Sequence, residues 1–349
     1  MTNGNLSRRN NASNSSTGEN RPFLLKPAAK DYLWGGRRLN DDFSKGIDME
    51  PLAETWECST HPDGPSVVGS GLHAGKILTE VLKEHPEYLG RHPKEIFPDN
   101  TGELPILIKL IDAKKNLSVQ VHPDDEYARI NENGQLGKTE MWYVLDATKT
   151  ARLVYGFSEM MDREKLSASL QDGSVEKFLR FVPVHKDDVF LVRAGTVHAI
   201  GAGTLVAEIQ ESSNLTYRMY DYNRVGKDGR KRELHIEKAL EVTDYSRSLE
   251  PRQPMRVLKY RPGCAAELLG RCRYFQVERM LLNTERQRQL LDFHTGSNSF
   301  QVLLCLQGCG VLQGAEESIL FFKGDCIFIP AESEMLKLHG KAVFLKISC

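Results

Sequence analysis

The sequence predicts a mostly β protein, built from two β barrels with a few peripheral helices. From Pro22 onward, short apolar runs alternate with stretches rich in Gly, Pro, Asn and Asp, which is the pattern of a sandwich or barrel of short strands. Helical periodicity is confined mainly to residues 77–83, 162–170 and 237–242. Residues 245–253 are polar and charged, and a second β region follows them.

This pattern divides the chain into three parts. Residues 1–21 are polar and of low complexity, so we expect a disordered tail. Residues 22–248 are expected to form a catalytic domain with a metal site, and residues 249–349 a second β domain without one. The segment Gly-Asp-Cys-Ile-Phe-Ile-Pro at 324–330 echoes Asp-Asp-Val-Phe-Leu-Val-Arg at 187–193, which two copies of one barrel would explain.

Individual strands are predicted where apolar and β-branched residues gather between turn signals. In the first domain they are residues 104–111, 117–122, 140–146, 152–157, 188–192, 204–210 and 215–220. In the second they are residues 275–282, 299–306, 318–322, 326–329 and 342–347.

Composition excludes several classes of partner. The chain of 349 residues carries 46 Lys and Arg against 47 Asp and Glu, so we expect no binding to nucleic acid or to a membrane. Its seven cysteines form no C-x-x-C pair, and its first residues lack the apolar segment of a signal peptide. We therefore expect free thiols and a cytoplasmic location. We also expect a monomer or weak homodimer.

Four residues have the chemistry and the spacing of a metal site. Gln120 and His122 are two apart in a predicted strand, so both side chains point to the same face. Glu140 begins another strand, and His198 follows a Gly turn. A single histidine in a strand is more often a hydrogen-bonded core residue, but two imidazoles, a carboxylate and an amide oxygen together suit Zn²⁺, Fe²⁺ or Mn²⁺.

The order of these pieces resembles the two signature motifs of the cupin barrel. Gln120 stands where many cupins have a first histidine, and Arg193 stands where they often have proline. This resemblance implies a jelly roll with a metal, and it does not choose a reaction.

Longer motifs resemble one family within the cupins, the type I mannose-6-phosphate isomerases in their short bacterial form. The resemblance covers roughly residues 22–245. It is carried by Tyr32-Leu-Trp-Gly-Gly, Glu54-Thr-Trp-Glu-Cys-Ser, Ile108-Lys-Leu-Ile-Asp-Ala, Leu117-Ser-Val-Gln-Val-His-Pro-Asp-Asp, Gly137-Lys-Thr-Glu-Met-Trp-Tyr, Ala194-Gly-Thr-Val-His-Ala and Gln210-Glu-Ser-Ser-Asn-Leu-Thr-Tyr-Arg-Met-Tyr-Asp-Tyr.

The resemblance implies a zinc-dependent isomerase that interconverts mannose 6-phosphate and fructose 6-phosphate, with one Zn²⁺ per chain. Its zinc ligands fall on Gln120, His122, Glu140 and His198, and its active-site arginine falls on Arg218. Lys138, Glu208, Ser118 and Lys109 fall on pocket positions. Ile200 stands where the longer enzymes carry an aromatic residue, so the resemblance implies no substrate contact for Ile200.

Aldose–ketose isomerisation requires a base beside a carbonyl and a group that holds the developing oxyanion. Lys138, Glu208 and a zinc-bound water are the candidate bases, and the sequence does not rank them. Arg218 suits either the enediolate or the phosphate. Two other functions stay open: an oxygenase that uses Fe²⁺ on the same ligands, and a protein that binds a sugar phosphate without catalysis.

Overall fold

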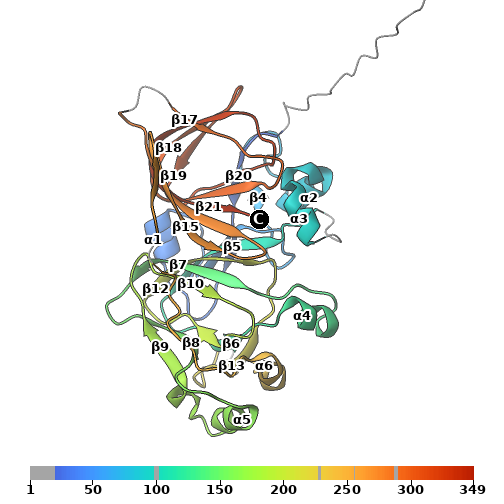
Figure 1. Cartoon of the computed structure of the whole chain (residues 1–349), viewed down its shortest axis with the longest axis vertical. Helices are drawn as coiled ribbons and strands as arrows, with labels where there is room; N and C mark the ends of the chain where they lie inside the picture. Colours follow the sequence, from blue (N-terminus) through green and yellow to red (C-terminus); the bar gives the residue numbers. More distant parts are fainter. Residues whose placement is uncertain (1–19, 98–101, 227–228, 255, 287–289) are drawn as a thin grey trace, which may run out of the picture.

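The structure is a computed structural model that describes residues 20–97, 102–226, 229–254, 256–286 and 290–349. The predicted mostly β architecture is confirmed: the strands form three sheets, and every pairing between them is antiparallel (Figure 1). Nearly all of the predicted disordered tail lies outside the described residues. At its end Asn20 is buried, and its side chain donates a 2.9 Å hydrogen bond to the carbonyl of Ala331.

A six-stranded sheet occupies the middle of the molecule. Its strands, in spatial order, are β10 (Val189–Val192), β7 (Glu140–Ala147), β12 (Thr204–Glu211), β5 (Ile106–Ala113), β3 (Glu54–Cys58) and β2 (Ala28–Lys30). All residues of β5 and β12 are buried, because this sheet is covered on both faces.

A five-stranded sheet faces one side of the six-stranded sheet. It contains, in order, β13 (Tyr217–Tyr220), β6 (Val119–Val121), β11 (His198–Ala199), β8 (Arg152–Phe157) and β9 (Leu179–Pro183). Side chains from β6 and β13 line the same pocket as side chains from β5, β7 and β12. The two sheets therefore form the walls of the first β unit, with the candidate site between them.

A ten-stranded sheet covers the other side of the six-stranded sheet. Eight of its strands follow one another in the order β14 (Lys259–Arg261), β15 (Cys264–Arg271), β16 (Gln276–Asn283), β21 (Leu336–Ser348), β18 (Gln301–Gln313), β20 (Cys326–Ile329), β1 (Phe23–Lys26) and β4 (Val67–Val68). The other two strands lie off this path: β17 (Leu291–Phe293) pairs with β21, and β19 (Ser318–Phe322) pairs with β18. The first strand of the chain thus joins the C-terminal sheet. The division of the chain at residue 248 stays a prediction.

The similar segments 187–193 and 324–330 form the same kind of turn, one in each of the two β units. Val144 on β7 exchanges backbone hydrogen bonds with Asp187 and Asp188, and Cys305 on β18 does the same with Gly324 and Asp325. The strands that follow, β10 and β20, pair back onto β7 and β18. By this correspondence the C-terminal unit has Gln301 at the position of Glu140.

The three predicted helices are confirmed as α2 (Leu78–Glu84), α5 (Arg163–Gln171) and α6 (Ile236–Val242). The structure adds α1 (Arg38–Phe43), α3 (Arg91–Ile96) and α4 (Asp125–Asn131), and two 3₁₀ turns at Pro86–Leu89 and Val175–Lys177. The added helices each bury one or two side chains, so they show little apolar periodicity. None of the described helices has the length and apolar character needed to cross a membrane.

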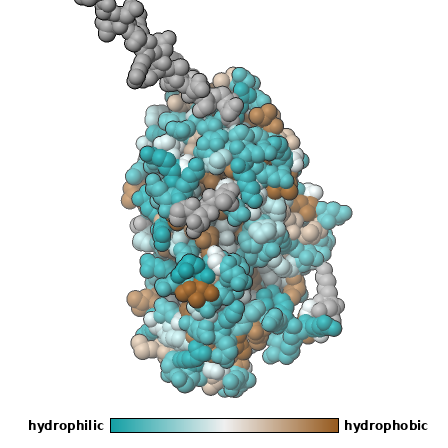
Figure 2. Space-filling model, turned by 90° about the vertical axis from the view of Figure 1, so that its right-hand side faces the viewer, coloured by the Kyte–Doolittle hydropathy of each residue, from teal (hydrophilic) through white to brown (hydrophobic). Residues whose placement is uncertain are grey.

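Apolar side chains gather between the layers. One cluster joins the six-stranded and ten-stranded sheets through residues such as Leu110, Ile209 and Val302, and another packs α5 and α6 beneath the five-stranded sheet. The surface seen in Figure 2 is mostly hydrophilic, with apolar side chains in small separate groups. The ten-stranded sheet therefore packs against one face of the six-stranded sheet, and the opposite face carries the site.

Candidate active site

Three of the predicted site residues lie in one row across the five-stranded sheet. Gln120 on β6 pairs in register with His198 on β11 on one side and with Arg218 on β13 on the other. Val119 and Val121 point away and are fully buried in the cluster beneath the sheet. The predicted alternation along this strand is confirmed, and it directs Gln120 into the pocket.

The two histidines present the same nitrogen to the site. His122 follows β6, and its Nδ1 lies 2.7 Å from the carbonyl oxygen of Leu215. The Nδ1 of His198 lies 2.7 Å from the carbonyl oxygen of Thr196. A carbonyl can only accept, so each Nδ1 carries the proton and each Nε2 keeps its lone pair. Both imidazoles are therefore oriented as metal ligands.

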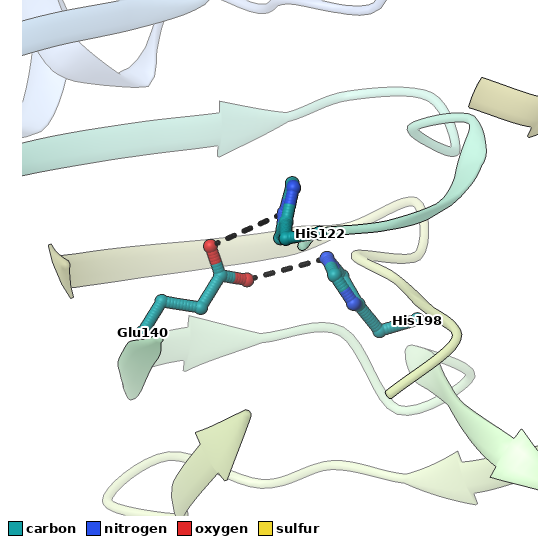
Figure 3. A group of neighbouring side chains, drawn as sticks. All are labelled: His122, Glu140 and His198. Atoms are coloured by element: carbon teal, nitrogen blue, oxygen red, sulfur yellow. Dashed lines mark ion pairs between the residues drawn. The ribbon is translucent and has the colours of Figure 1, made fainter. Parts of the chain in front are cut away.

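Glu140, the first residue of β7, brings a carboxylate between these nitrogens (Figure 3). Its Oε1 lies 3.3 Å from His198 Nε2, and its Oε2 lies 3.6 Å from His122 Nε2. Ligands at 2.0–2.1 Å around a tetrahedral zinc lie about 3.3 Å apart. Oε1 is buried and has no hydrogen-bond partner among the described residues, so these three donors fit a metal ion.

Gln120 is less well oriented than the other three. Its Nε2 lies 3.4 Å from His198 Nε2, while its Oε1 lies 3.5 Å from the Ser118 hydroxyl. An amide binds a metal through oxygen, so Gln120 would have to turn its amide over to become a ligand. The two orientations of an amide are assigned from its hydrogen bonds. Its role as fourth ligand stays a prediction.

Burial sets the protonation of the cluster. It lowers the pKa of His198 to about 4, and together with Lys138 it lowers the pKa of His122 well below the ordinary value. Burial and the neighbouring Glu208 raise the pKa of Glu140. Neutral imidazoles are the metal-binding form, so the surroundings favour binding by both histidines well below neutral pH.

Lys138 lies directly beside this cluster. It is two residues before Glu140 and is 4% exposed. Its Nζ lies 3.2 Å from His122 Nε2, forms an ion pair with Glu140, and lies 3.9 Å from Glu208. The lysine expected at the pocket is thus within reach of both the metal-binding atoms and the space where a substrate would lie.

Lys109 and Glu208 form a buried ion pair on the facing sheet. They are register partners on β5 and β12, and Lys109 Nζ lies 3.2 Å from Glu208 Oε1. Trp142 Nε1 donates a 3.0 Å hydrogen bond to the other oxygen, Oε2. Burial alone would raise the pKa of Glu208, but Lys138 and Lys109 hold it below the usual range. Both carboxylate oxygens of Glu208 therefore already have a partner, Lys109 for Oε1 and Trp142 for Oε2.

Arg218 and Ser118 line the pocket between the two sheets. Arg218 Nε donates to the Ser118 hydroxyl over 3.3 Å, and its Nη1 donates to the carbonyl of Glu233 over 2.8 Å. In the part of the chain that the structure describes, Arg218 forms no ion pair with a carboxylate. Its charge is available to an anion.

All these groups converge on one pocket of about 260 Å³. Six of the predicted residues line it: Lys109, Ser118, Gln120, Lys138, Glu208 and Arg218. His122, Glu140 and His198 are 0–1% exposed and lie behind Gln120 and Lys138, which contact them. The structure therefore brings all nine residues together.

The pocket also contains residues that the sequence analysis did not assign: Tyr32, Glu54, Asn214, Thr216 and Arg232. The first four lie within motifs that carry the family resemblance, so a signal for them existed. Arg232 lies outside those motifs, and no spacing marks it.

Two family models match the chain. The catalytic domain of type I phosphomannose isomerase matches residues 23–150, and the cupin domain of mannose-6-phosphate isomerase matches residues 267–348. The chain is 36% identical to the mannose-6-phosphate isomerase ManA of Bacillus subtilis, over 92% of this chain and 96% of that protein. It is 46% identical to the probable mannose-6-phosphate isomerase GmuF of the same organism, over 63% of this chain and 68% of the relative.

Solved structures share the fold. The crystal structure of mannose 6-phosphate isomerase from Bacillus subtilis superposes with a TM-score of 0.82 at 33% identity, covering 94% of this chain and 99% of that one. A structure described as the zinc-bound holo form of mannose 6-phosphate isomerase has a TM-score of 0.71 at 18% identity, covering 93% and 98%.

Proposed function

This chain belongs to the type I mannose-6-phosphate isomerase family and is an isomerase, and from that premise we propose that it interconverts mannose 6-phosphate and fructose 6-phosphate with one bound Zn²⁺. One observation carries the proposal. Nε2 of His122, Nε2 of His198 and the carboxylate of Glu140 lie within 4.8 Å of one another, directly behind a pocket lined by Lys138 and Arg218.

The donor set of this chain supports a metal. His122, Glu140 and His198 are the proposed ligands, and Gln120 is a candidate for the fourth. When bound, a zinc ion would supply Lewis-acid stabilisation for the carbonyl and enediolate oxygens of the substrate. The same nitrogen and oxygen donors also suit Fe²⁺ and Mn²⁺, so the identity of the metal needs its own measurement.

The chain itself must move a proton between two neighbouring carbons. Lys138 is our first candidate, because its Nζ touches the metal-binding nitrogen of His122 and also lines the pocket. Glu208 is the rival, but its oxygens are engaged by Lys109 and Trp142, and its lowered pKa makes it a weak base. We propose that Glu208 holds the two lysines in position.

Anion binding falls to the opposite wall of the pocket. Arg218 keeps its charge, has five donors and forms no carboxylate pair among the described residues, so it suits the phosphate or an enediolate oxygen. Ser118, which accepts from Arg218 Nε, would orient that guanidinium. Lys109 is deeper in the structure and is committed to Glu208.

A chelation experiment tests the proposal. The purified protein is assayed for conversion of mannose 6-phosphate to fructose 6-phosphate, while its metal is measured by mass spectrometry. We expect about one zinc per chain, loss of activity after chelation, and recovery when Zn²⁺ is added. No turnover in the zinc-loaded protein would refute the isomerase proposal. Bound iron with oxygen-dependent turnover would favour an oxygenase instead.

The remaining expectations are tested separately. We propose a cytoplasmic location, supported by the free state of all seven cysteines, and a monomer or weak homodimer. Cell fractionation and light scattering at several protein concentrations would check them.

A further inference from the structure

Arg232 shares the active-site pocket with Arg218 and has no assigned role. It lies on the return arm of the chain that follows β13, where an isolated bridge pairs Val225 with Lys231. Both arginines line the pocket of about 260 Å³. The Arg218 guanidinium donates to the backbone of Glu233, the residue next to Arg232, so the two cationic side chains approach the same region of the pocket.

The Arg232 side chain is held in a defined position. Its Nε lies 2.9 Å from Asp221 Oδ2, and its Nη2 lies 2.6 Å from Asp221 Oδ1. Asp221 is 5% exposed, and this two-point contact fixes the plane of the guanidinium. Arg224 binds the same carboxylate and the carbonyl of Asn116. One carboxylate therefore anchors two arginines.

This arrangement leaves excess positive charge at one wall of the pocket. Arg224 and Arg232 share the carboxylate of Asp221, and Arg218 forms no ion pair with a carboxylate among the described residues. Burial and the Arg232 guanidinium both lower the pKa of Arg218, as expected for two cations at one wall of the pocket. Two guanidinium groups at one pocket wall are stabilised when an anion lies between them.

The other cations of the pocket are already neutralised. Lys109 lies 3.2 Å from Glu208 and 4.0 Å from Glu54, while Lys138 pairs with Glu140. A phosphate dianion entering the pocket would therefore find uncompensated charge at the Arg218 wall rather than at the lysines.

We propose that Arg232 is a substrate-binding residue that holds the phosphate group together with Arg218, on the side of the pocket away from the histidine cluster. This inference rests on the proposed function for the identity of the sugar, but the phosphate site itself does not require catalysis. It assigns the deep end of the pocket to the carbons that react, and it gives Asp221 the role of positioning Arg232.

Arg224 provides a matched control. It pairs with the same carboxylate, yet it lines a separate cavity of about 240 Å³, to which Arg232 also contributes, and not the active-site pocket. Replacing either arginine removes one guanidinium and leaves Asp221 with one partner. A general effect of charge loss or of loosening this segment would therefore appear in both variants.

The test titrates inorganic phosphate into the wild-type protein and the Arg232→Ala, Arg232→Lys and Arg224→Ala variants, using calorimetry. We expect Arg232→Ala to weaken phosphate binding by about tenfold to a hundredfold, since a charge-assisted hydrogen-bonded pair is lost. Arg232→Lys should fall between the wild type and Arg232→Ala, because it keeps the charge and loses the two-point geometry. Arg224→Ala should remain within about threefold of the wild type.

Kinetics provide the second readout. In Arg232→Ala, KM for mannose 6-phosphate should rise by about tenfold or more, with kcat within about threefold, because the lost contact is made equally in ground and transition states. Unchanged phosphate affinity in Arg232→Ala, or an equal loss in Arg224→Ala, would overturn the inference. If the wild type binds phosphate through Arg232 but does not isomerise, the proposed function fails and the phosphate site stands.

Discussion

Nζ of Lys138 lies 3.2 Å from Nε2 of His122, and both side chains are almost completely buried. The ammonium group and a metal ion would therefore compete for the same lone pair. Lys138 also lines the substrate pocket. If His122 held a metal through this nitrogen, Lys138 would be left facing the pocket that it lines, where the reacting carbons of a sugar would lie.

Replacing Lys138 with methionine should separate metal binding from catalysis. Lys138→Met removes a cation next to the ligands, so zinc affinity should rise by about tenfold or more, since like charges a few ångströms apart repel strongly in a buried site. If Lys138 moves the proton, kcat should fall by about 10² to 10⁴. Competition with a fluorescent chelator and steady-state kinetics measure the two effects.

The exposed Lys149 is the control for Lys138, and Lys149→Met should change neither quantity. Loss of zinc from Lys138→Met would mean that the lysine supports the site. A kcat within threefold of the wild type would leave Glu208 or a zinc-bound water as the base.

His198 should be required for metal retention. His198→Ala removes one of three converging donors. Loss of a hydrogen bond that merely supports a metal ligand costs about 10- to 100-fold in metal affinity, so loss of the ligand itself should lower zinc affinity by more than that, and activity should fall with it. His185 is the control, because its side chain is 78% exposed. Full zinc content and full rate in His198→Ala would show that the metal site is wrongly assigned.

Much of the fold could be predicted from local pattern alone. The predicted strands 152–157, 318–322 and 326–329 match β8, β19 and β20 residue for residue. The predictions for β18 and β21 were too short: the first ended before Gly308 and the second began after Gly340. Gly308 and Gly340 have positive φ, and Gly308 follows an irregularity in the β18–β21 pairing through which the strand continues.

The candidate site depended on two kinds of information. Strand alternation correctly put Gln120 on the inner face, but Lys109 and Glu208 are 99 positions apart (208 minus 109), and their contact depends on the register between β5 and β12. The family resemblance supplied that pair, not the pattern. Arg232 was missed because it reaches the pocket through a tertiary contact with Asp221, which leaves no periodic signal.

Stability should depend on pH through Glu211. Burial, assisted by the nearby Asp125, raises the pKa of Glu211 to about 9, so the folded protein keeps this carboxyl protonated where the unfolded chain ionises it. Its contribution to stability is fully present below the unfolded pKa and is lost as the pH rises toward 9. Relative to wild type, Glu211→Gln should gain on the order of a few kcal/mol between pH 5 and pH 9.

Urea unfolding at pH 5, 7 and 9 measures this difference for wild type and variant. The exposed Glu126 is the control, and Glu126→Gln should differ from the wild type by less than about 0.5 kcal/mol at every pH. A constant offset between Glu211→Gln and wild type across the range would show that Glu211 is already ionised in the folded state.

The pair formed by Lys109 and Glu208 should show strong coupling. Each residue is 4% exposed, so Lys109→Met or Glu208→Gln alone leaves its partner without its main countercharge and should cost about 3 to 5 kcal/mol of unfolding free energy. The double variant removes both charges and should cost clearly less than the sum. Lys109 also lies 4.0 Å from Glu54, so some loss should remain. Additive effects in this double-mutant cycle would mean that the two charges do not stabilise each other. Lys109 would then no longer argue against Glu208 as the catalytic base.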